Sequence, residues 1–415
     1  MLDRTCLGTV PAKPHTALRD EAGKLLYEHC LTRQGFDGGY SILYHRSLPP
    51  RDVAHRSTHL PGDPELYFDE CLRRRHLLGT RLSAEARPDR AAGQAPSQVS
   101  DRSAPLGDHL GTRRVLMANS DVAIGLCRAL RAEPRYFANG DGDELYFVQE
   151  GAGRIESLFG VLAYKPGDYL LIPRGTIYRM VPDAGPDGTA SSLLLFIEGR
   201  TYLEIPQNFR NGHGMLRMDA PYSHRDFRRP TELCKKSGPD FSDGRYSILV
   251  KRGGTFHEIV RDCDPLDVVG WDGSVYPLAL SIHDYNPKVG RVHLPPTAFT
   301  TFVGGGFVVC SFVPRLCDFD ANAIPCPYPH SSVDCDEVLF YVSGNFTSRR
   351  GIGPGSLSLH PAGIPHGPQP GAYEASIGKA RTDELAVMID TFKPLGVTAE
   401  ARTIDDPNYH DSWHR

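Results

Sequence analysis

Three residues between positions 330 and 366 have types and spacing that suit a metal ion: His330, Glu337 and His366. His330 precedes Glu337 by seven residues, and a turn-rich connector then leads to His366. Two imidazoles and one carboxylate leave three coordination positions open on a ferrous ion, so an organic ligand can chelate at two and O2 can bind at the third. The plain alternative is three polar residues near turns, because His and Glu are common on protein surfaces.

The glycines and the proline around these residues favour the metal site, because the stretch resembles the two-part cupin signature. In that signature one strand pair supplies His-x-His-x4-Glu and a later hairpin supplies the last His. Here Ser332 replaces the second His, and Gly344 follows Glu337 by seven residues. The second half of the frame is Gly355-x5-Pro361-x-Gly363-x2-His366. The frame predicts a β-barrel whose strands and tight turns bring the three side chains together.

A second copy of this frame lies earlier in the chain. Glu144 precedes Gly151 by seven residues, and Gly167-x5-Pro173-x-Gly175-x2 then ends on Tyr178 where the later copy has His366. Asn139 and Asp141 stand where we expect the pair of histidines upstream of Glu144. A spaced internal repeat indicates duplication. We therefore expect two barrels, of which the first has kept its turns and lost its metal.

The composition favours short strands and many turns, since the 415 residues include 34 Pro and 42 Gly. Lys and Arg number 46 against 50 Asp and Glu, a net charge of −4 without long runs of one sign, so neither nucleic acid nor an anionic membrane is an expected partner. The sequence has no apolar run long enough to span a membrane and no signal-peptide segment at its N-terminus. Ten scattered Cys without a CxxC motif are typical of reduced thiols in a cytoplasmic protein.

We expect an all-β dominated bicupin, that is, two tandem cupin barrels, with metal in the C-terminal barrel and a degenerate N-terminal barrel. The expected division is 1–205 for an N-terminal β region with its barrel core at 114–201, 206–274 for an inter-barrel segment, 275–395 for the catalytic barrel and 396–415 for a tail. The segment 80–112 is nearly free of large apolar residues, so a flexible loop is expected there, either a lid or a plain surface insertion.

Several further blocks, in this order, resemble the homogentisate 1,2-dioxygenase family. They are LDVVGWDG from Leu266, HLPP from His293, FVPR from Phe312, the metal stretch, HGP from His366 and NYH from Asn408, with DGD from Asp141 in the first barrel. The resemblance implies a bicupin with non-haem Fe(II) that uses O2 to cleave the ring of homogentisate or a closely related para-dihydroxylated aromatic acid. An extradiol-type reaction with a maleylacetoacetate-type product and a homo-oligomer, either a trimer or a hexamer, are implied as well.

The resemblance also assigns roles at the metal. It implies that the iron ligands are His330, Glu337 and His366, and it places His293 at the position of the family's catalytic base. A base with a pKa near 7 is needed to take a phenol proton, and His is the natural choice. The alternative for His293 is a buried imidazole satisfied by a backbone carbonyl.

Four further residues are expected to contact substrate: Tyr328, His360, Phe346 and Arg349. Tyr328 matches a substrate-contacting residue, and His360 matches a His near the substrate hydroxyl, although it could instead orient a metal ligand. Phe346 stands where many members carry Tyr, which removes a hydrogen bond that could orient the ring. Arg349 stands near a family Lys associated with the substrate carboxylate and changes its geometry. The spacing of seven between His330 and Glu337 is one longer than in better-known members.

Two other classes of function stay open at this point. One is a metal-dependent bicupin of different chemistry, an isomerase or decarboxylase with Mn or Zn, which the loss of a third His at Ser332 disfavours. The other is a non-catalytic bicupin, which the intact frame of the second barrel disfavours. Which hydroquinone is cleaved, and whether for catabolism or biosynthesis, also stays open.

Overall fold

The computed structural model describes residues 4–35, 38–49, 52–58, 80–83, 108–133, 135–185, 188, 190–235, 244–347 and 351–409. Strands dominate this part of the chain and form four sheets. The helices are short: α3 (Ala372–Ser376), α4 (Ala399–Arg402) and the 3-10 turns η2 (Gln207–Phe209), η3 (His224–Asp226), η4 (Ile282–Asp284) and η5 (Pro296–Phe299). Among the described residues, no helix has the length and apolar character needed to cross a membrane.

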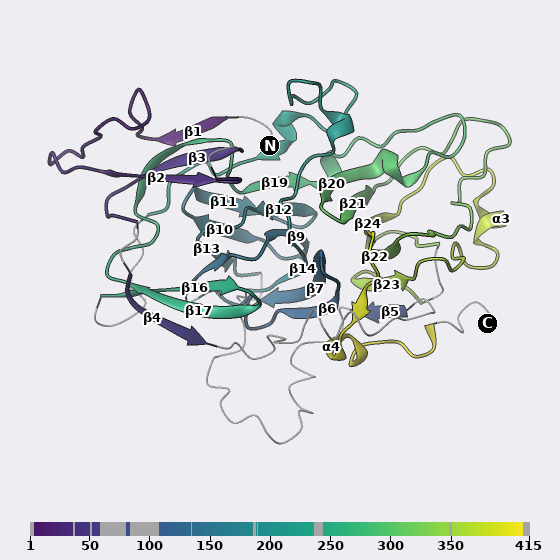
Figure 1. The fold of residues 1–415 in the computed structure, drawn as a ribbon. Helices are drawn as coiled ribbons and strands as arrows, with labels where there is room; N and C mark the ends of the chain where they lie inside the picture. The colour runs from purple at the N-terminus through teal and green to yellow at the C-terminus, as the bar shows by residue number, and fades with distance from the viewer. Residues whose placement is uncertain are drawn as a thin grey trace, which may run out of the picture.

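Two sheets lie on the left in Figure 1. The four-stranded sheet has the order β1 (Thr5–Gly8), β18 (Val268–Gly273), β3 (Tyr40–His45), β2 (Tyr27–Thr32). The seven-stranded sheet has the order β11 (Gly160–Tyr164), β10 (Gly153–Ser157), β13 (Tyr178–Pro182), β8 (Tyr136–Asn139), β16 (Tyr246–Arg252), β17 (Thr255–Arg261), β4 (Asp52–Thr58).

The other two sheets lie at the centre and on the right of the same view (Figure 1). The eight-stranded sheet has the order β15 (Phe227–Arg228), β19 (Leu278–Ser281), β12 (Asp168–Ile172), β9 (Asp143–Glu150), β14 (Ser192–Gly199), β7 (Val122–Ala129), β6 (Arg114–Ala118), β25 (Gly396–Val397). The six-stranded sheet has the order β20 (Thr300–Gly304), β21 (Phe307–Phe312), β24 (Leu385–Thr391), β22 (Asp336–Ser343), β23 (Ser356–His360), β5 (Thr80–Ser83).

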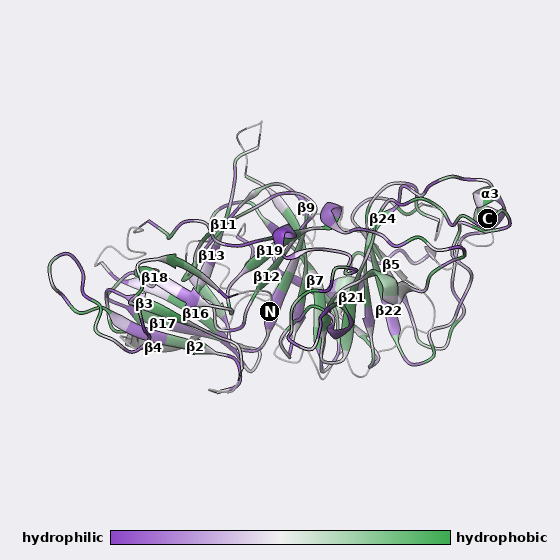
Figure 2. Ribbon diagram, turned by 90° about the horizontal axis from the view of Figure 1, so that it is seen from above, coloured by the Kyte–Doolittle hydropathy of each residue, from purple (hydrophilic) through white to green (hydrophobic). Residues whose placement is uncertain are grey.

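Apolar side chains join these sheets into layers. One core lies between the seven- and eight-stranded sheets and includes Phe137 and Tyr146. A larger core joins the eight- and six-stranded sheets, where the rings of Phe147 and Phe340 lie 6.1 Å apart. In Figure 2 the strands at the centre of the molecule, such as β7 and β12, are largely hydrophobic. Because successive side chains of a strand face opposite ways, β22 can pack Phe340 on the first barrel and turn Glu337 the other way.

The strand register shows that the two frames of the sequence fold alike. Glu144 pairs with Ile172 as Glu337 pairs with His360, each carboxylate opposite the fifth residue after the frame glycine. The frame glycines also match: Gly151 and Gly344 have φ of 80° and 99°, in the left-handed region that favours glycine. The chain therefore has the predicted bicupin fold.

The same register corrects one sequence-based assignment. The bridge between His330 and His366 corresponds to the pairing of Phe137 with Tyr178. Phe137, and not Asn139, therefore stands at the first His position of the degenerate barrel. Asn139 stands at the second position, where the later copy has Ser332, because the backbone N–H of Gly175 donates to its carbonyl as that of Gly363 donates to Ser332. Asp141 instead accepts hydrogen bonds from the backbone N–H groups of Gly253 and Gly254, a loop contact. The sequence prediction was misplaced because it counted back from Glu144 by too few residues.

Segments beyond residue 205 contribute strands to the sheets of the first half. β16 pairs with β8, β19 pairs with β12, and β25, which follows residue 395, pairs with β6. The proposed division at 205, 274 and 395 stays a prediction. Most of the segment 80–112 lies outside the described residues.

Candidate metal centre and active site

Three separate segments bring the predicted ligands together. Glu337 is the second residue of β22, which begins at Asp336. His330 lies in the segment before β22 and His366 in the segment after β23. The two residues form an antiparallel bridge, with both N–H to O=C hydrogen bonds at 2.8 Å. The backbone bridge holds the two imidazoles side by side, with ring centroids 4.3 Å apart. The fold thus places the side chains of His330 and His366 next to each other, although they are 36 residues apart in the chain.

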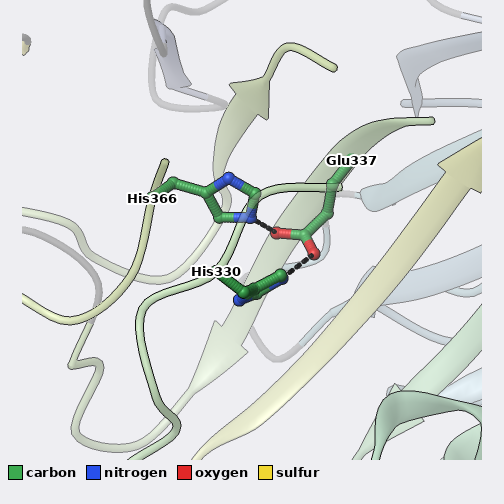
Figure 3. A group of neighbouring side chains, drawn as sticks. All are labelled: His330, Glu337 and His366. Carbon is green, nitrogen blue, oxygen red and sulfur yellow. Dashed lines mark ion pairs between the residues drawn. The ribbon is translucent and has the colours of Figure 1, made fainter. Parts of the chain in front are cut away.

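Both imidazoles present Nε2 to the carboxylate of Glu337 (Figure 3). His330 Nε2 lies 3.7 Å from Oε2, and His366 Nε2 lies 3.4 Å from Oε1. The Nδ1 atoms face backbone carbonyls instead, that of Tyr328 for His330 at 3.4 Å and that of Ile364 for His366 at 3.1 Å. Such contacts place the proton on Nδ1 and leave the Nε2 lone pair for a metal.

Electrostatics at the carboxylate agree with a cation site. Burial alone would raise the pKa of Glu337, but the imidazoles of His330, His360 and His366 hold it well below its usual range. The pKa of His330 is raised, chiefly by its contact with the Glu337 carboxylate. The charged carboxylate is therefore stable in a site where it is almost inaccessible to water.

A divalent metal fits this group of residues. The ligand atoms of His330, Glu337 and His366 lie within 4.8 Å of one another, and among the described residues they form the one such group of three or more His, Cys, Asp or Glu side chains. His366 Nε2 is buried and has no hydrogen-bond partner in the described part of the chain. Imidazole nitrogens and carboxylate oxygens are ordinary ligands of divalent metals, so the chemistry of this group suits such an ion.

Two more side chains surround the ligands. The Nδ1–H of His360 donates to Glu337 Oε1, 2.7 Å away, and the His360 ring stacks on that of His366 at 4.4 Å. Asp390 faces Glu337 across the β22–β24 pairing, and its pKa is raised to about 7 by burial and by the charge of Glu337. Sequence reasoning missed Asp390, although an acidic residue in the otherwise apolar strand Leu385–Thr391 was a usable signal.

A cavity of about 380 Å³ opens beside the ligands. Its wall includes His293, Tyr328, His360 and the three ligands. The ring of Tyr328 lies between two imidazoles, 5.0 Å from that of His293 and 6.4 Å from that of His330. Burial and then the charge of Arg315 lower the pKa of His293. A neutral imidazole therefore faces the same space as the metal ligands.

Phe346, one of the residues expected at substrate, does not line this cavity. Phe346 is buried, with its ring 4.9 Å from that of Tyr341, while its neighbours Asn345 and Thr347 line the cavity. The Phe346 side chain thus packs in the hydrophobic core. Arg349 lies outside the described residues.

Comparison with known proteins identifies the family. Residues 117–282 match the family model described as homogentisate 1,2-dioxygenase N-terminal, and residues 279–415 match the C-terminal one. The chain belongs to the homogentisate 1,2-dioxygenase family. The resemblance in the sequence motifs is thereby confirmed, and the protein is an enzyme of a dioxygenase family.

Individual relatives of this dioxygenase differ in their sequence identity to it and in the share of each chain that is matched. "Putative dioxygenase SSO1533" of Saccharolobus solfataricus is 36% identical, with 98% of each chain covered. Homogentisate 1,2-dioxygenase of Bradyrhizobium diazoefficiens is 28% identical over 67% of this chain and 62% of its own length, so the match spans less than two thirds of that relative. Among solved structures, a cupin 2 conserved barrel domain protein from Leptotrichia buccalis matches with a TM-score of 0.32 and 10% identity over 75% of this chain and 97% of its own.

The first barrel of this dioxygenase holds an arginine where the second presents ligands. Arg113 donates to Glu144 Oε1 and to Glu198 Oε2, each at 2.7 Å. Glu144 is the equivalent of Glu337, and Glu198, which pairs with Glu144, is the equivalent of Asp390. Tyr178, the equivalent of His366, donates to Glu144 Oε2 at 2.8 Å. The guanidinium supplies here the positive charge that a metal would supply in the second barrel.

Buried charges in the first barrel compensate one another. Burial alone would lower the pKa of Arg113, but Tyr146, Glu144 and Glu198 outweigh it and hold that pKa well above its usual range. Burial would raise the pKa of Glu198, whereas Lys251 and Arg113 lower it to about 2. No spacing rule in the sequence links Arg113 to this frame, so sequence reasoning missed it.

Proposed function

We propose that this protein is an Fe(II)-dependent dioxygenase that cleaves the ring of homogentisate or a closely related para-dihydroxylated aromatic acid with O2. The product would be of the maleylacetoacetate type. The main support for the proposal is the group formed by half-buried His330 and buried Glu337 and His366, beside a cavity of ligand size. Among the described residues, the Nε2 atom of His366 has no hydrogen-bond partner. Two imidazoles and one carboxylate suit ferrous iron that activates oxygen.

The chain's own residues would hold the metal and keep it oriented. His330, Glu337 and His366 would be the ligands, and iron bound there would supply adjacent positions for a ring oxygen and for O2. His360 fixes the Glu337 carboxylate through its hydrogen bond at 2.7 Å. The backbone carbonyls behind His330 and His366 fix their tautomers. In this proposal Tyr328 forms part of the wall against which the aromatic ring lies.

His293 would act as the general base. Its lowered pKa keeps the imidazole neutral at pH 7, so it can accept the proton of a ring hydroxyl. The side chain lines the cavity but lies outside the group of ligand atoms. It would therefore serve the substrate and not the metal.

Two further features belong to the proposal. The enzyme would work in the cytoplasm, which suits the nine free thiols among its described cysteines. It would also assemble as a homo-oligomer, a trimer or a hexamer, as the family resemblance implies. Light scattering after size-exclusion chromatography measures the mass of the assembly, and a monomer at micromolar concentration would refute the second feature.

The test is oxygen consumption by the enzyme loaded anaerobically with Fe(II). Homogentisate, gentisate and related hydroquinones are offered in turn, with the product followed by absorbance and mass spectrometry. The expected result is one O2 consumed per ring opened, and no turnover with zinc or manganese. Turnover of a substrate without O2 would instead place the enzyme among isomerases or decarboxylases.

Variants assign the roles within this test. His293→Gln should retain iron and lose about 10²- to 10⁴-fold in turnover, the usual cost of removing a general base. His283→Gln is the matched control, because His283 is an exposed imidazole that does not line the cavity. Loss of iron from His293→Gln, or near-normal turnover, would contradict the assigned role.

A further inference from the structure

The cavity that contains the metal ligands extends to a second group of charged residues. Its wall includes Arg315, Lys379, Arg381, Asp383 and Glu384 as well as the ligands. Glu384 comes immediately before β24, whereas Asp390, beside the ligands, is the sixth residue of that strand. Six residues of extended chain span roughly 20 Å. One cavity therefore connects two polar ends that lie far apart along a strand.

Much of the cavity wall is apolar. It includes Phe299, Val308, Phe312, Leu339 and Met388. Homogentisate is a single ring with one short acid arm, and bound at the metal it would leave this apolar stretch and the far end to water. A cavity of about 380 Å³ is in the range that holds a larger ligand. The wall thus suits a hydrocarbon arm on the ring.

Arg315, whose backbone pairs with Thr382 two residues before Glu384, is the cation of the cavity wall that most needs an anion. Its guanidinium carbon lies 4.7 Å from the centroid of the Phe299 ring, and its side chain is half-buried. No ion pair joins Arg315 to any residue in the described ranges, since Asp318 and Glu384 act on it only through longer-range attraction. Burial lowers the pKa of Arg315 in spite of these two carboxyls. A half-buried cation without a contacting counterion favours binding of an anionic ligand.

The backbone holds Arg315 in place for this role. Its N–H donates to Thr382 Oγ1 at 3.3 Å, and its carbonyl accepts from the Thr382 N–H at 2.8 Å. Lys379 and Arg381 are exposed, so water screens their charges more strongly. Burial raises the pKa of Glu384 to about 7, so this carboxyl is partly protonated at neutral pH and competes little for Arg315.

We propose that Arg315 binds a carboxylate at the end of an alkyl arm on the substrate ring. This inference rests on the proposed function and narrows its substrate class to para-dihydroxylated rings whose acid arm is longer than acetate. In this inference Arg315, a residue of the cavity wall, binds the substrate anion, a role that the sequence resemblance suggested for Arg349. The arm lies along the apolar wall while the ring occupies the metal end.

Binding to zinc-loaded protein tests the inference without turnover. Calorimetry compares 2,5-dihydroxyphenylacetate with 4-(2,5-dihydroxyphenyl)butanoate, each as the free acid and as the methyl ester. The long acid should bind about tenfold to a hundredfold more tightly than its ester, the usual range for a charge-assisted hydrogen bond. The short acid should show a smaller ratio, because its carboxylate does not reach Arg315.

Three variants assign the effect to Arg315. Arg315→Met keeps the aliphatic stem over Phe299 and should reduce the acid-to-ester ratio of the long ligand to about one, with the ester bound as before. Arg315→Lys should keep part of the ratio. Arg291→Met is the matched control, since Arg291 is 76% exposed and pairs with Asp320 outside the cavity wall. Thermal melting of each variant checks that it is folded.

Two results would overturn the inference. One is an unchanged acid-to-ester ratio in folded Arg315→Met, and the other is a short acid that binds wild type as tightly as the long one. A loss of the ratio in Arg349→Ala with Arg315→Met unaffected would return the role to Arg349. Failure of the proposed function is distinguishable, because it appears as no O2 uptake with any hydroquinone, whatever the binding ratios.

Discussion

Replacing Arg113 by Met should destabilise the first barrel strongly. Arg113 donates to two carboxylates, Glu144 and Glu198, whose side chains are each only 1% exposed. Its guanidinium carbon also lies 4.0 Å from the centroid of the Phe196 ring. Met fills similar space but carries no charge, so the variant leaves buried negative charge without its main partner.

The magnitude follows from what remains around each carboxylate. Glu198 keeps Lys251, whose Nζ lies 2.6 and 2.8 Å from its two oxygens. Within the described part of the chain, Glu144 keeps only the hydroxyls of Tyr146 and Tyr178, at 3.0 and 2.8 Å. Breaking a buried pair by removing one partner costs about 3–5 kcal/mol, and the retained Lys251 places the expected loss near the lower end, about 3 kcal/mol.

Urea unfolding followed by circular dichroism at pH 7 measures this loss. Arg217→Met is the control, because Arg217 pairs with Asp219 on the surface, where an ion pair contributes about 1 kcal/mol or less. The double variant Arg113→Met/Glu144→Gln should recover part of the stability, since an amide has no charge to bury. A single Arg113 variant no less stable than the control, or a double variant less stable than the single one, would refute the reasoning.

Three further outcomes are expected. Glu198 has a pKa of about 2 against an ordinary 4.5, so its charge should stabilise the fold fully above pH 4.5, and roughly 3 kcal/mol of this stability should be lost as the pH falls toward 2. In Glu198→Gln the free energy of unfolding should therefore depend less steeply on pH in the acid range, and an unchanged slope would count against this role. Elemental analysis of iron-loaded enzyme should find one iron per chain, reduced to near zero in His366→Ala with an unchanged circular dichroism spectrum; two irons per chain would show that the first barrel also binds metal. His360→Ala should weaken metal binding about tenfold to a hundredfold in a chelator competition, because Glu337 loses the contact that orients it; unchanged affinity would remove that role from His360.

The repeated spacing of Glu, Gly and Pro residues in the sequence was enough to predict the fold class and the metal ligands of this protein. The spacing from Glu337 to Gly344, repeated from Glu144 to Gly151, was enough to predict two barrels of one fold. Such a frame can be recognised because tight turns require glycine at fixed places and strands alternate their faces. For the same reason the ligand triad could be named before its geometry was known.

The partners of these frames were decided by the tertiary structure alone. Glu144 and Glu337 have the same local sequence surroundings, yet one contacts Arg113 and the other faces two imidazoles. Arg315 likewise carries no motif that distinguishes it from a surface arginine. Phe346, expected at substrate, is in the core. The spacing of residues in the sequence predicts which residues are neighbours within a turn or strand. Which charged group or ring contacts a side chain across a barrel depends instead on which distant strands pair. Burial in the barrel then determines how strong that contact is, because the local dielectric is low.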